Sequence, residues 1–143
     1  MGIDVLEDLL HTVLPVALER LGERGGFHPF GAGRSADGDT WFVAAFDGPT
    51  RPPGADLVAL LEERVGRAAR SGEYVAAALV SDVRMRGRDG AAREAVRVFL
   101  EHADGACVEV FMPYRQDPET GRVETDELMP HPVRGHLFMG REP

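Results

Sequence analysis

The sequence is poor in the residues that build disulfides, metal knuckles and membrane spans. It contains one cysteine, Cys107, so it can form neither an internal disulfide nor a cysteine-based metal site. No apolar run approaches the roughly 20 residues that a membrane-spanning helix needs. The first residues include the acidic Asp4, where a secretory signal carries basic residues. These absences predict a cytoplasmic protein that contacts no membrane.

Basic residues are also scarce. Lysine is absent, so the 16 basic residues are all arginines, and 24 acidic residues give a formal net charge of -8. Nucleic-acid binding needs clustered Lys and Arg to displace counterions, so we expect no nucleic-acid partner. A basic protein partner is compatible with the charge. The acidic, Pro-rich tail from about residue 115 either docks such a partner through Asp117 to Glu127 or is a solvated loop.

Motifs that carry catalysis or hold a cofactor are missing. There is no phosphate-binding loop, no nucleophile elbow and no His-Glu-x-x-His pair. Gly31-Ala32-Gly33 lacks the third glycine and the following helix of a dinucleotide fingerprint. His131 and His136 lie five residues apart, but zinc needs two further ligands. Cys107 lies among apolar neighbours, which is typical of an inert thiol. We therefore expect no cofactor and no metal, and favour a non-enzymatic protein.

Hydrophobic periodicity and turn signals predict two helices and five main strands. Leucines at three- and four-residue steps predict a helix over residues 4–21, which Pro15 should kink or break near Val13. The remaining predicted elements are a hairpin over 27–46 with its turn at Asp37-Gly38, a helix over about 57–69, strands over 74–85, 93–102 and 106–114, and a short closing strand over 135–139. Asp89-Gly90 and Asp104-Gly105 separate the later strands, because Gly supplies the positive φ of a tight turn. Residues 93–102 also fit a helical stripe, but the alternation of Val96, Val98 and Leu100 favours a strand.

The order helix, hairpin, helix, three-stranded meander predicts one α+β domain over residues 1–143. We expect a five-stranded antiparallel sheet with two helices packed on one face.

The Phe-His-Pro-Phe-Gly-Ala box at residues 27–32, the Asp-Gly turn behind it, and the later Glu101-His102 and Pro113-Tyr114 pairs resemble a family of small, uncharacterised bacterial proteins. The resemblance touches most of residues 27–114. It implies a shared fold and no activity.

Apolar residues on both faces of the predicted sheet point to an interaction surface. If Phe42, Leu79 and Val96 face the helices, the opposite face has nothing in the chain to cover it. The candidate interface on that face is Trp41, Val43, Ala76, Ala78, Val80, Phe99 and Phe111. An uncovered apolar patch usually marks a protein interface or a ligand groove. The sequence therefore favours an interaction domain that forms a homodimer and binds a protein partner.

A polar pocket is the alternative. His28, Arg34, Asp82, Arg84 and Tyr114 could meet at one rim of the sheet and serve a small-molecule binder or a small enzyme. Asp82, Arg84, Arg86 and Glu101 could instead form a cross-strand charge ladder on a solvated face, which we prefer.

Overall fold

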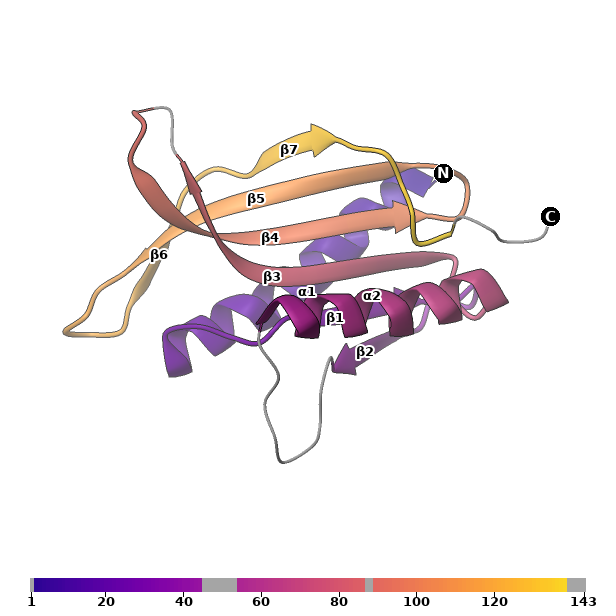
Figure 1. Ribbon diagram of the computed structural model, residues 1–143, viewed down its shortest axis with the longest axis horizontal. Helices are drawn as coiled ribbons and strands as arrows, with labels where there is room; N and C mark the ends of the chain where they lie inside the picture. The colour runs from indigo at the N-terminus through magenta and orange to yellow at the C-terminus, as the bar shows by residue number, and fades with distance from the viewer. Residues whose placement is uncertain (1, 45–53, 87–88, 139–143) are drawn as a thin grey trace.

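The computed structural model describes residues 2–44, 54–86 and 89–138. These residues form an α+β fold with two helices and an antiparallel sheet of seven strands (Figure 1). The helices are α1 (Gly2–Arg24) and α2 (Gly54–Ser71), and the strands are β1 (Phe30–Arg34), β2 (Thr40–Ala44), β3 (Ala76–Arg86), β4 (Ala92–His102), β5 (Cys107–Gln116), β6 (Val123–Thr125) and β7 (Met129–Pro132). The sheet order is β2-β1-β3-β4-β5-β6, and β7 also pairs with β5. Ala45 and Phe46 of the predicted hairpin lie outside the described residues.

The predicted hairpin and meander are present. Gly38, Gly90 and Gly105 have φ angles of 94°, 82° and 102°, as the Asp-Gly turn signals require. Residues 92–102 are a strand and not a helix, because β4 pairs along its length with β3 and β5. Two further short strands, β6 and β7, arise from the tail, so the count of five was too low.

Helix α1 runs through Pro15 as one helix of 23 residues, so the predicted break is wrong. A proline inside a helix costs about 3 kcal/mol because it removes a hydrogen bond and crowds the preceding turn. Leu6, Leu9, Val13, Ala17 and Leu21 are fully buried along one side of the helix. Burying a leucine side chain contributes about 2 kcal/mol, so this stripe outweighs the cost of Pro15.

The two helices cover opposite faces of the sheet, which corrects the prediction that both pack on one face. Helix α1 packs with the even-numbered residues of β3, including Ala78 and Val80. Helix α2 packs with the odd-numbered Ala77 and Leu79. In Figure 1, α2 lies in front of the sheet and α1 behind it.

The prediction failed because the first half of β3 is apolar on both faces. Its sequence therefore does not show which residues face which side of the sheet. The register pairs Val80 with Val98, which places both on the α1 face. Val96 lies two residues from Val98 on the same face, so assigning Val96 to one face and Val80 to the other was wrong by one residue. The candidate interface is divided accordingly: Ala76, Ala78 and Val80 are buried under α1, and Phe99 is buried on the α2 face.

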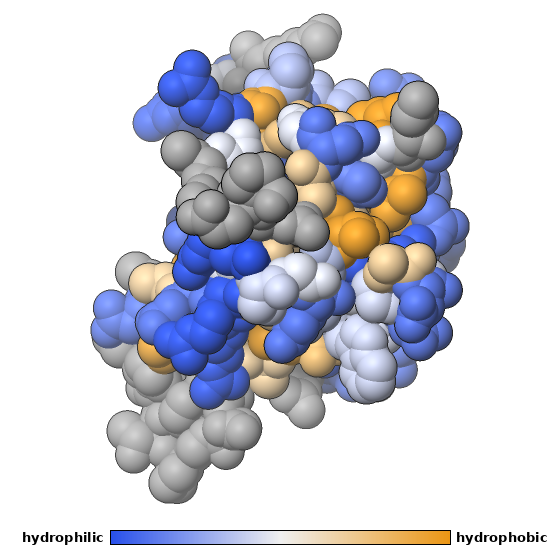
Figure 2. Space-filling view, turned by 90° about the vertical axis from the view of Figure 1, so that its right-hand side faces the viewer, coloured by the Kyte–Doolittle hydropathy of each residue, from blue (hydrophilic) through white to orange (hydrophobic). Residues whose placement is uncertain are grey.

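The tail covers the part of the α2 face that α2 does not reach. Val133, Leu137 and Phe138 pack with Phe99 and Cys107 in the second core. Residues 133–138 are not a strand, so the predicted closing strand over 135–139 is wrong; β7, at residues 129–132, takes the pairing position on β5 instead. Figure 2 shows one side of the molecule, on which hydrophobic residues gather mainly in the upper right of the view.

Two glycines in β1, Gly31 and Gly33, allow close packing against the strand. A Cβ atom on Gly31 would lie 2.9 Å from Val65 Cγ2, and one on Gly33 would lie 2.3 Å from Tyr74 Cζ. The two glycines therefore let α2 and Tyr74 approach β1 closely.

Candidate functional site

Strand β2 is an edge strand with two exposed aromatic side chains. Among the described residues it pairs only with β1. Trp41 is 57% exposed and Phe42 is 49% exposed, and as neighbours on a strand they point to opposite faces. Val43, from the candidate interface, is half-buried. The five residues of β2, Thr-Trp-Phe-Val-Ala, carry no charge. Exposed edge strands usually carry charged residues that prevent pairing with another strand.

The backbone of β2 offers hydrogen-bonding groups on its outer side. Ser35 N–H donates to the Asp39 carbonyl at 2.9 Å, and hydrogen-bonded pairs alternate along an antiparallel ladder. Trp41 and Val43 therefore direct their N–H and C=O groups towards β1, whereas Thr40, Phe42 and Ala44 direct theirs outward. The Arg64 guanidinium donates to the Ala44 carbonyl at 3.1 Å, in agreement with this alternation.

A groove of about 580 Å³ lies beside this edge, between α1 and β2. Arg20 of α1 lies over the Phe30 ring, with its guanidinium carbon 4.6 Å from the ring centroid. The Phe30 and Phe42 rings lie 6.2 Å apart. His28 lines the same groove and is exposed. The groove is thus an aromatic surface that continues from Phe42 to α1.

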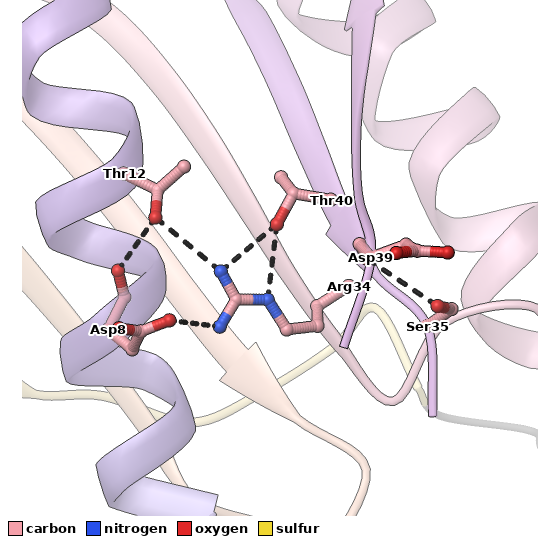
Figure 3. Close-up of polar contacts among 6 residues, drawn as sticks. All are labelled: Asp8, Thr12, Arg34, Ser35, Asp39 and Thr40. Carbon is pink, nitrogen blue, oxygen red and sulfur yellow. Dashed lines mark hydrogen bonds and ion pairs between the residues drawn. The ribbon is translucent and has the colours of Figure 1, made fainter. Parts of the chain in front are cut away.

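Arg34 ties the first hairpin to α1 (Figure 3). Its guanidinium donates to Thr40 Oγ1 at 3.0 Å and forms an ion pair with Asp8. The arginine side chain is 12% exposed, and Thr12 also lies against it. The predicted pocket residue Arg34 therefore bonds to three side chains of the fold itself.

Asp82 and Tyr114 form the one direct contact within the predicted polar pocket. The Tyr114 hydroxyl donates to Asp82 Oδ1 at 2.7 Å. Burial raises the pKa of Asp82; the hydrogen bond from Tyr114 partly opposes this rise, and the charge of Glu94 adds to it. Burial also raises the pKa of Tyr114, and its hydrogen bond to Asp82 adds to the rise. Both groups are therefore harder to ionise than in water, which suits a structural hydrogen bond.

Next to this pair, charged side chains form a ladder of ion pairs across neighbouring strands, with Arg84 and Glu94 on the α1 face and Arg93, Arg115 and Glu124 on the other. Arg84 Nε lies 3.3 Å from Glu94 Oε1, and Glu94 pairs with Tyr114 in the register. Arg93 lies 3.6 Å from Asp126, and Arg115 lies 3.9 Å from Glu124. These side chains line an open pocket of about 850 Å³. In the acidic tail, Glu124 thus lies in strand β6 beside the ladder, and Asp126 follows the strand directly.

The five predicted pocket residues do not form one site. Asp82, Arg84 and Tyr114 gather at the ladder, but His28 lines the groove beside β2. Arg34 pairs with Ala76 in the register, six positions along β3 from Asp82, which is a distance of about 20 Å. The hypothesis of a single rim is therefore wrong for Arg34.

The prediction that Glu101 belongs to a charge ladder on a solvated face is wrong, because this carboxylate is buried and holds the tail. Glu101 is 4% exposed, and its oxygens accept hydrogen bonds from the backbone N–H groups of His136 and Leu137 at 2.8 Å and of Phe138 at 3.4 Å. A Cβ atom on Gly135 would lie 2.4 Å from Glu101 Oε2. The only signals were a glutamate inside a buried strand and a glycine before Leu137-Phe138. We name this arrangement the Glu101 latch.

The two histidines of the tail lie against aromatic rings, and Cys107 packs against the second core. The His136 ring lies 4.9 Å from the Phe99 ring, and His131 lies against Phe111. Within the described ranges, no group of three or more His, Cys, Asp or Glu side chains is placed to hold a metal ion. Burial raises the pKa of Cys107 to about 11, with smaller contributions from the charges of Glu101 and Glu109. At neutral pH this thiol is therefore protonated and unreactive.

Comparison with protein-family models, with curated proteins and with solved structures found no match to this chain. Neither described helix is long and apolar enough to span a membrane.

Proposed function

We propose that the protein is a non-enzymatic interaction domain that self-associates through the edge strand β2. The observation that carries this proposal is the pair of exposed aromatic side chains, Trp41 and Phe42, on an uncharged edge strand. Exposed edges of this composition pair with other strands unless something covers them. The proposal keeps Trp41 and Val43 from the candidate interface and moves the contact from the sheet face to the sheet edge.

The test is the mass of the protein in solution. Light scattering after size exclusion should give about twice the chain mass of 15.6 kDa at a concentration of about 100 micromolar, because a short edge strand buries a small interface. Trp41→Glu should return the protein to the monomer, since an unpaired carboxylate in an apolar contact costs several kcal/mol.

Leu128→Glu provides the matched control. Leu128 is 38% exposed and lies between β6 and β7, on the other side of the sheet order from β2. It receives the same charge on an exposed apolar side chain and should leave the dimer intact. A wild-type monomer at this concentration would overturn the proposal.

A second candidate is a small-molecule site at the ladder, favoured by the Asp82–Tyr114 hydrogen bond beside an open pocket. Arg84, which lines this pocket, would bind an anionic group there. A thermal-shift panel of small carboxylates and phosphates tests it. A stabilising compound whose effect is lost in Arg84→Ala, but kept in Arg64→Ala, would support this function.

A further inference from the structure

We infer that two copies of the chain pair through β2 in antiparallel fashion, about a two-fold axis that passes through Phe42 and joins the two sheets into one. This inference rests on the self-association proposed above. It adds the partner's orientation and the residue at the centre of the contact.

The outward backbone groups permit this register. Thr40, Phe42 and Ala44 direct their N–H and C=O groups away from β1, as Arg64 bound to the Ala44 carbonyl also indicates. With the axis at Phe42, each Phe42 faces its counterpart and the pair exchanges two backbone hydrogen bonds. Thr40 of each copy then faces Ala44 of the second copy, which repeats the exchange. The Ala44 carbonyl can keep Arg64 as well, because a carbonyl oxygen has two lone pairs.

Other axes fit less well. An axis at Trp41 or Val43 would also let outward groups bond, but it would pair only three of the five residues of the strand with the second copy. An axis at Thr40 or Ala44 would leave most of the strand without a partner. The central residue of a five-residue strand gives the fullest overlap.

The side chains are complementary in this register. A two-fold axis perpendicular to the sheet keeps the two faces separate, so both Phe42 rings meet on the α1 face beside the Phe30 rings. On the α2 face, Trp41 of each copy meets Val43 of the other. Pairs of aromatic residues and of aromatic with β-branched residues are favourable cross-strand contacts. The axis thus covers both exposed aromatic side chains at once.

Charge also favours the antiparallel orientation. Asp37 and Asp39 lie exposed at the start of β2, and Arg64 lies at its end against Ala44. Antiparallel pairing brings the acidic end of each copy to the arginine of the other. Parallel pairing would bring acidic ends together in a protein of net charge -8. The strand is therefore self-complementary, and a second copy fits it.

Disulfide trapping tests the register in chains that carry Cys107→Ala. In an antiparallel hydrogen-bonded pair the Cα atoms lie about 5.5 Å apart, within the range of about 4.4 to 6.8 Å that a disulfide spans. Phe42→Cys should therefore form a covalent dimer on mild oxidation. Ala44→Cys, exposed on the same strand, is the control, because its two copies would lie about 14 Å apart. We expect at least a tenfold difference in the rate of cross-linking.

Amide exchange in the unmodified protein gives a second test that no substitution disturbs. In the dimer the amides of Phe42 and Ala44 should exchange as slowly as those of Trp41 and Val43, and on dilution to monomer only the first two should become fast. A wild-type dimer with equal cross-linking at positions 42 and 44, or with a fast Phe42 amide, would overturn this register and leave self-association standing. A wild-type monomer at about 100 micromolar, the range of a weak interface, would overturn both.

Discussion

Replacing Glu101 by glutamine should weaken the latch that holds the tail. The substitution keeps the size of the side chain and removes its charge. Leu137 and Phe138 are 1% and 8% exposed, so the latch places two large apolar side chains in the second core. We expect Glu101→Gln to lower the free energy of unfolding by about 2 to 3 kcal/mol.

The magnitude follows from the three hydrogen bonds. His136 and Leu137 both donate to Oε1 at 2.8 Å, and glutamine can keep both by placing its carbonyl oxygen there. Each bond then loses its charge assistance, about 1 kcal/mol apiece. The glutamine nitrogen would face the Phe138 N–H, so the third bond is lost. Its 3.4 Å length makes it worth less than about 1 kcal/mol.

Urea denaturation measures the loss, and Glu109→Gln is the matched control. Glu109 accepts a hydrogen bond from Arg97 Nε at 2.8 Å on the same face of the sheet, where the two side chains are 26% and 19% exposed. Removing this partly exposed pair should cost about 1 kcal/mol or less. Equal losses in the two variants would refute the reasoning that the latch is the stronger contact.

The rate at which a thiol reagent modifies Cys107 gives a second measure of the weakened latch. Glu101 and Glu109 both help to raise the pKa of this thiol to about 11, so either glutamine variant should speed its modification by a thiol reagent at pH 8 through charge alone. Only Glu101→Gln also releases Val133 and Leu137 from the cluster that contains Cys107. The modification rate should therefore rise more in Glu101→Gln than in Glu109→Gln.

Three further outcomes are expected. Val80→Glu should unfold the protein, seen as loss of its circular dichroism, because Val80 is fully buried under α1 and an unpaired carboxylate there costs several kcal/mol; a folded variant would contradict the assignment of Val80 to that core. Asp82→Asn should melt at the same temperature as the wild type or higher at pH 7. Burial raises the pKa of Asp82, so the contribution of this carboxyl is present at low pH and is lost as the pH rises above about 4; melting curves at pH 3.5 and 7 check whether the difference appears only at the higher pH. A metal chelator should leave the melting temperature unchanged, because the described residues contain no cluster suited to a metal; a large drop on chelation would contradict this.

Local signals in the sequence predicted most of the elements correctly. The Asp-Gly turns require a positive φ that glycine provides, and the alternation of Val96, Val98 and Leu100 requires a strand with one side in a core. Helix α2 follows from its spaced Leu57, Leu61 and Val65, all of which are buried. Each of these signals depends only on residues close in the chain.

The faces of the sheet could not be predicted in the same way. Residues 76–80 are apolar at every position, so either phase of β3 is consistent with the sequence. The choice depends on the pairing of Val80 with Val98, which is a contact between strands. The prediction of one polar pocket failed for a related reason. Arg34 and Asp82 lie at different positions along the strands, and only the register shows this.

The sequence by itself determined the class of the fold, the hairpin, the meander and the apolar composition of β2, since these depend on periodicity and on turn chemistry. The tertiary structure alone decided that α1 and α2 cover opposite faces, that Glu101 binds the backbone of residues 136–138, and that β2 lies at an edge with Trp41 and Phe42 exposed. These features depend on contacts between residues far apart in the chain, and the free energy of such contacts is set by packing and register.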